Sequence, residues 1–79
     1  MKIEVLGTGC AKCGKLYEAA REAVRQSGVE AEVVKVEDLT RIMKYRVMAT
    51  PALVVDGQVR FAGRVAAVAE ILELLRQAG

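Results

Sequence analysis

The chain has 79 residues, 53% of them hydrophobic and 28% charged, which is the balance of one small globular domain. Its 12 basic and 10 acidic residues leave a net charge of +2, and both signs are interspersed, so neither nucleic acid nor an anionic membrane is an expected partner. The chain has no histidine, which excludes serine–histidine and cysteine–histidine catalytic pairs and imidazole metal ligands. We expect a single domain over residues 1–79 whose chemistry depends on its two cysteines and its carboxylates.

The first half of the chain predicts a strand, a helix and a second strand. β-Branched residues over 2–6 favour a strand that ends at Gly7. Ser27-Gly28 is a typical helix end, and residues 31–36 are rich in valine, as expected of a second strand. Between them, apolar residues recur at helical spacing: Leu16, Ala19, Ala20, Ala23 and Val24.

The second half predicts a short helix, a hairpin and a last helix. Asp38 is a good N-cap for a helix carrying Leu39, Ile42 and Met43. Strands over 52–55 and 58–62 are joined by Asp56-Gly57, a strong hairpin signal. After Gly63, the residues that line the final helix, which ends near Gly79, are Val65, Val68, Ile71, Leu72 and Leu75.

The predicted order of elements is therefore βαβαββα. The first βαβ unit implies a parallel pair of strands with a right-handed crossover, and the hairpin adds antiparallel strands. This order predicts an α/β fold with a mixed four-stranded sheet and helices on both faces.

Cys10 and Cys13 form a C-x-x-C motif at the first junction from strand to helix. The partial positive charge of a helix N-terminus stabilises a thiolate and lowers the pKa of a thiol there. We expect Cys10 to lie exposed at the helix start and Cys13 to point toward the protein, one turn later. One thiolate then attacks a substrate disulfide and the other resolves the mixed disulfide, without a cofactor.

Other interpretations of the pair remain open. Flanking glycines and Lys12 argue against two buried structural cysteines, and a disulfide closing so short a loop stabilises a fold by only about 2 kcal/mol. The main alternative is a soft-metal carrier, because two thiolates suit Cu(I). Such domains usually carry methionine where this chain has Thr8, and they end on a strand. A binding module switched by oxidation is a further alternative.

Several segments resemble thioredoxin-like proteins, and the resemblance covers essentially the whole chain. Lys44-Tyr45-Arg46-Val47-Met48-Ala49-Thr50-Pro51 is similar to the thioredoxin segment that leads into the cis-proline. Asp56-Gly57 resembles the thioredoxin hairpin turn, and Gly63 the glycine before the last helix. Gly7-Thr8-Gly9-Cys10-Ala11-Lys12-Cys13 and Gly63-Arg64-Val65-Ala66 are closer to the small redox-active disulfide proteins of archaea and bacteria.

The resemblance implies a minimal thioredoxin fold and a thiol–disulfide oxidoreductase. It makes Cys10 the attacking thiol, Cys13 the resolving thiol, and Pro51 the cis-proline beside them. Thr50 would offer backbone hydrogen bonds to a bound substrate. Glu4 matches the thioredoxin acid six residues before the first cysteine, and we expect it to be buried or half-buried because its strand should be central.

The remaining expectations concern substrate contact and partners. Gly7, Gly9 and Ala11 leave room for an incoming chain, and Lys12 adds positive charge. Met48 and Ala49 are expected to form an apolar rim, with a core position as the alternative for Met48. We expect a disulfide-containing protein or a small thiol as substrate and a reductase or thiol pool as electron donor. No secretory signal or membrane span is recognisable, which favours a cytoplasmic protein, and we expect a monomer.

The motif also departs from the families that it resembles. Gly9 stands where thioredoxins have tryptophan, and Ala11-Lys12 replaces the Gly-Pro dipeptide between the cysteines. The redox potential of thioredoxin is therefore not transferable to this chain. The glycine pair with which glutaredoxins bind glutathione is not evident either, which argues against glutathione dependence.

Overall fold

The computed structural model describes residues 1–9 and 11–78 of the chain. The elements follow the predicted order βαβαββα. In chain order they are β1 (Lys2–Leu6), α1 (Ala11–Ser27), β2 (Glu32–Val36), α2 (Leu39–Lys44), β3 (Ala52–Val55), β4 (Gln58–Ala62) and α3 (Val68–Ala78).

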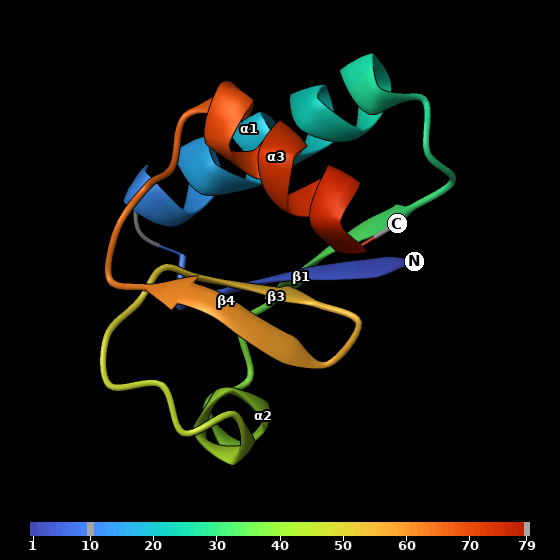
Figure 1. Ribbon diagram of the computed structural model, residues 1–79. Coiled ribbons are helices and arrows are strands. Elements are labelled where there is room, and N and C mark those ends of the chain that lie inside the picture. Colours follow the sequence, from blue (N-terminus) through green and yellow to red (C-terminus); the bar gives the residue numbers. More distant parts are fainter. Residues whose placement is uncertain (10, 79) are drawn as a thin grey trace.

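The four strands form one mixed sheet in the order β2-β1-β3-β4 (Figure 1). β1 is parallel to β2 and antiparallel to β3, and β3 is antiparallel to β4. The predicted sheet is confirmed, and β1 is central in it, as the expectation for Glu4 required. A central β1 places Gly7, which follows that strand, at a sheet end flanked by β2 and β3.

Helices cover both faces of the sheet: α1 and α3 lie together on one face and α2 lies on the other (Figure 1). Side chains alternate along β1, so that Ile3 and Val5 pack toward α1 and α3 while Leu6 packs toward α2. The core under α1 and α3 is the larger one and includes Ile3, Val5, Leu16, Ala20, Leu53, Val55, Ile71 and Leu75. The smaller core under α2 consists of Leu6, Val36, Ile42, Ala52 and Val54.

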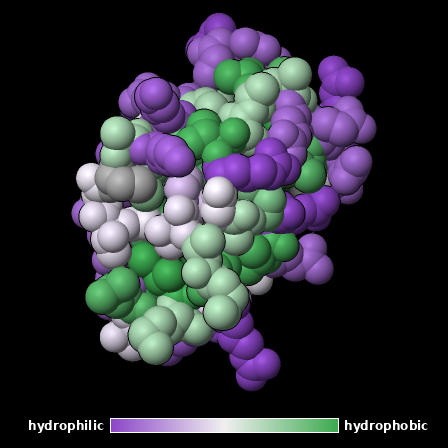
Figure 2. All heavy atoms as spheres, turned by 90° about the vertical axis from the view of Figure 1, so that its left-hand side faces the viewer, coloured by the Kyte–Doolittle hydropathy of each residue, from purple (hydrophilic) through white to green (hydrophobic). Residues whose placement is uncertain are grey.

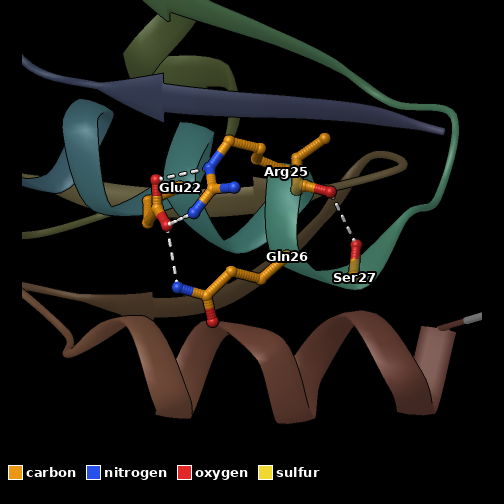
Figure 3. A network of polar contacts seen from close by, with 5 residues as sticks. Glu22, Arg25, Gln26 and Ser27 are labelled. Carbon is orange, nitrogen blue, oxygen red and sulfur yellow. Dashed lines mark hydrogen bonds and ion pairs between the residues drawn. The ribbon is translucent and has the colours of Figure 1, made fainter.

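Local polar contacts explain where several elements begin and end. Asp56 and Gly57 both have positive φ, 49° and 83°, which is the backbone of a tight type I′ hairpin turn. Asp38 caps α2 by accepting a hydrogen bond from the N–H of Thr40 at 2.9 Å. At the end of α1, the Ser27 hydroxyl donates to the Val24 carbonyl at 2.9 Å (Figure 3).

The last helix begins later than the sequence predicts. α3 starts at Val68, so Val65 lies before the helix and is exposed. The chain turns at Gly63, where φ is 82°, and Arg64 then forms an ion pair with Glu70 in the first turn of α3. The helical spacing of Val65 was therefore misleading, because the turn and its ion pair hold this residue in the connecting segment.

Candidate active site

Cys13 lies in the first turn of α1, and its side chain is buried, as predicted. It packs directly over Gly7, the residue after β1, whose N–H donates to the Val36 carbonyl at 3.0 Å. A Cβ built on Gly7 would overlap the Cys13 Sγ and would lie 3.1 Å from the Cys13 Cβ. Glycine at position 7 is what lets the start of α1 approach the sheet. Cys10, the predicted attacking thiol, lies outside the described residues.

The segment before β3 lies against the same glycine. The Thr50–Pro51 peptide bond is cis, Pro51 is buried, and its carbonyl accepts a hydrogen bond from the N–H of Gly63 at 2.8 Å. Thr50 is exposed, and its Cβ would be 4.0 Å from a Cβ on Gly7. The structure thus brings Thr50 and Cys13, 37 positions apart in the sequence, next to the same glycine.

Glu4 is buried, with 4% of its surface exposed, which confirms the expected burial. Its carboxylate faces α2, where the Tyr45 hydroxyl donates to Oε1 at 2.7 Å and Arg41 Nη2 lies 3.5 Å from Oε2. The hydrogen bond to Glu4 raises the pKa of Tyr45 above its usual value of 10.0, because it favours the protonated phenol, and burial adds to the effect. Sequence reasoning missed both partners of Glu4. Their spacing of four residues, which places them on one side of a helical segment, was the available signal.

The other predicted substrate contacts lie at the surface. Gly9, Ala11 and Lys12 are exposed between the end of β1 and the first turn of α1, and Gly9 has a positive φ of 82°. Met48 is 98% exposed, which excludes the core alternative. Leu39 and Met43 on α2 are also well exposed, and a patch of hydrophobic residues occupies the lower part of the face in Figure 2.

A pocket of about 260 Å³ opens beside Cys13. It lies between the start of α1 and the end of β2, and its lining residues are Val5, Gly7, Gly9, Cys13, Gly14, Lys35 and Glu37. Among residues 1–9 and 11–78, no group of three or more acidic or cysteine side chains is placed to hold a metal ion. In the same part of the chain, none of the helices has the length and apolar character that crossing a membrane requires.

Comparison with known proteins identifies the family. Residues 1–76 match the family model of the thioredoxin domain. The chain belongs to the thioredoxin family. It is 44% identical over 75 residues to a thioredoxin of Methanothermobacter thermautotrophicus, covering 95% of this chain and 97% of the relative. It is 40% identical over 74 residues to a thioredoxin of Methanocaldococcus jannaschii, covering 94% of this chain and 85% of that protein.

The solved structure of thioredoxin 1 from Thermosipho africanus has the same fold, with a TM-score of 0.68 at 17% identity. The match covers 99% of this chain and 93% of that one. Membership of the thioredoxin family makes this chain a thiol–disulfide oxidoreductase, which acts on disulfide substrates and receives electrons from a reductase. None of these comparisons favours the soft-metal carrier.

Proposed function

We propose that this thioredoxin-family chain is a cytoplasmic, monomeric, single-domain reductase of protein disulfides, with Cys10 as the attacking thiol and Cys13 as the resolving thiol. The observation that carries the assignment of Cys13 is its burial over Gly7, beside Thr50. A buried thiol in the first turn of α1 is poorly placed to meet a folded substrate first. We therefore assign it the second step, attack on a mixed disulfide formed at Cys10, three residues earlier.

The exchange transfers two electrons to the substrate in two displacements. The Cys10 thiolate attacks one sulfur of the substrate disulfide, and the other substrate sulfur leaves as a thiolate. The Cys13 thiolate then attacks the Cys10 sulfur, which releases the second substrate thiolate and leaves a Cys10–Cys13 disulfide. A reductase or a thiol pool reduces that disulfide and completes the cycle.

Exposed backbone and apolar side chains support a protein substrate. Thr50 lies at the surface beside Gly7, and in this proposal its backbone pairs with an extended substrate segment. Met48, two residues earlier, provides an exposed apolar rim, and methionine adapts to varied partners. Within and just before the motif, the exposed Gly9 and Ala11 leave space for a substrate chain and Lys12 contributes positive charge.

The test is reduction of insulin disulfides by the pre-reduced protein. We expect Cys10→Ser to reduce the rate to the uncatalysed background, and full activity in that variant would contradict the assignment. Cys13→Ser should accumulate mixed disulfides through Cys10, because the resolving step is removed. Mass spectrometry of the trapped species then distinguishes the substrates: protein adducts support the proposal, and glutathione adducts alone contradict it. Absence of adducts together with tight Cu(I) binding would favour a metal carrier.

A further inference from the structure

The pocket beside Cys13 lies away from the Thr50 side of the site. Its floor is formed by Val5, which is buried, and by Gly7, and its charged side is formed by Lys35 of β2 and Glu37 directly after β2. At about 260 Å³ it is smaller than the roughly 300–1,000 Å³ of pockets for drug-sized ligands. It therefore suits a small metabolite better than a polypeptide segment.

Gly14, in the wall of this pocket, is not explained by the fold. A glycine inside a helix destabilises it relative to alanine. Gly14 lies in α1 and is not among the glycines with positive φ, so its backbone does not require glycine. A Cβ built there would meet no heavy atom within 4 Å, so packing does not require glycine either. Because Gly14 lines the pocket, a methyl group at position 14 would reduce the volume of the pocket.

The two charged residues of the pocket have opposite signs and lie at the surface. Both Lys35 and Glu37 are exposed, and among the ion pairs of the described residues none joins them. The Lys35 ammonium lies 4.7 Å from the centroid of the Tyr17 ring. Tyr17 is on α1, one turn after Gly14, so this cation–π contact holds the Lys35 side chain beside α1. Lys35 and Glu37 are two residues apart and both line the pocket, so their charges complement a ligand that itself carries a carboxylate and an ammonium.

We propose that this pocket binds the amino-acid part of a small zwitterionic thiol or of its disulfide, with the ligand carboxylate at Lys35 and its ammonium at Glu37. The sulfur end of the ligand then faces the side of the pocket that Cys13 forms. The inference rests on the proposed function, because it gives the same C-x-x-C pair a second class of substrate besides proteins. It concerns the binding step, and the exchange chemistry is the one already described.

The first test measures binding without thiol exchange. S-methylcysteine carries both charges but cannot form a disulfide. Titrated into the ¹⁵N-labelled protein, it should shift the amide signals of Gly7, Gly9, Gly14 and Lys35. 2-(Methylthio)ethylamine, which lacks the carboxylate, should bind more weakly. No saturable shift at these amides with millimolar S-methylcysteine would overturn the proposal.

Variants of the wall and the charged side sharpen the test. Because Lys35 and Glu37 are exposed, Lys35→Gln and Glu37→Gln should each weaken S-methylcysteine binding by roughly two- to fivefold, the range expected of exposed charge pairs. Gly14→Ala should weaken it through the lost volume, and Lys15→Gln, an exposed charge on α1 outside the pocket, serves as the matched control. Equal affinities in the control and the pocket variants would contradict the assignment.

A kinetic comparison separates this inference from the proposed function. The ratio of kcat/KM for cystine to that for the uncharged hydroxyethyl disulfide should fall in Lys35→Gln by a similar factor. If the wild-type chain reduces insulin but does not bind S-methylcysteine, the pocket proposal alone fails. If the wild-type chain binds S-methylcysteine but does not reduce insulin, the proposed function fails instead.

Discussion

Gly7 is the position where a single methyl group should disturb the site most. In Gly7→Ala the new Cβ overlaps the Cys13 Sγ, so Cys13 or the first turn of α1 must move. Overpacking of this kind typically costs about 1–3 kcal/mol. A domain of this size has a total stability of roughly 4–12 kcal/mol, and each kcal/mol corresponds to about 4–8 °C in melting temperature. We expect a large fall in Tm together with faster alkylation of Cys13, because its sulfur is pushed from its buried position.

Gly14→Ala, at the residue that follows Cys13, is the matched control. A Cβ at position 14 meets nothing within 4 Å, and alanine in a helix is favoured over glycine by about 0.5–1 kcal/mol. The same substitution should therefore raise the Tm at position 14 and lower it at position 7, measured by thermal and urea unfolding of both variants. Equal stability of the two variants would refute the reasoning, because it would mean that Cys13 does not pack on Gly7 as the structure shows.

Two further predictions concern pH. The pKa of Tyr45 is raised by its hydrogen bond to Glu4, so that bond stabilises the fold fully below pH 10 and is lost as pH rises through the folded-state pKa. Tyr45→Phe should be less stable near pH 7 by about 1.5–3 kcal/mol in urea unfolding, with a difference that shrinks above pH 10, and a difference independent of pH would contradict this. The pKa of Glu22 is lowered from 4.5 to about 2 by the hydrogen bonds that Arg25 and Gln26 donate (Figure 3). The stability that it adds is present above pH 4.5 and lost toward pH 2, so wild type and Glu22→Gln should differ at pH 7 and converge near pH 2 in acid unfolding curves.

The strands were predictable because their signals are local. Regular β-branched stretches and the Asp56-Gly57 turn gave β1, β3 and β4 with the bounds that the structure has. Val65 shows where such signals fail: it fits the helical spacing, but the turn at Gly63 keeps it out of α3. A periodic pattern identifies which residues share a helix face, whereas the first residue of the helix depends on contacts made by the connecting segment.

The site was predictable as a motif but not as an arrangement. The sequence predicts that Cys13 points inward and that Glu4 is buried, because both follow from position in an element. It does not show that Gly7 is the surface on which Cys13 rests, and it assigned Gly7 the role of leaving room for a substrate. The Tyr45 and Arg41 contacts of Glu4 were missed for the same reason, since they join residues about 40 positions apart through the tertiary fold.

The buried carboxylate of Glu4 connects the sheet to the segment that carries Thr50. Burying a carboxylate is unfavourable unless partners compensate, and here both partners come from α2 and the residue that ends it. Tyr45 is thereby fixed to the central strand six positions before Pro51, while Gly63 holds the Pro51 carbonyl at the other end of the segment. With both ends held, Thr50 stays beside Gly7, where we propose that a substrate chain binds. Glu4 therefore contributes to the site by holding Tyr45 in place, although its carboxylate faces α2.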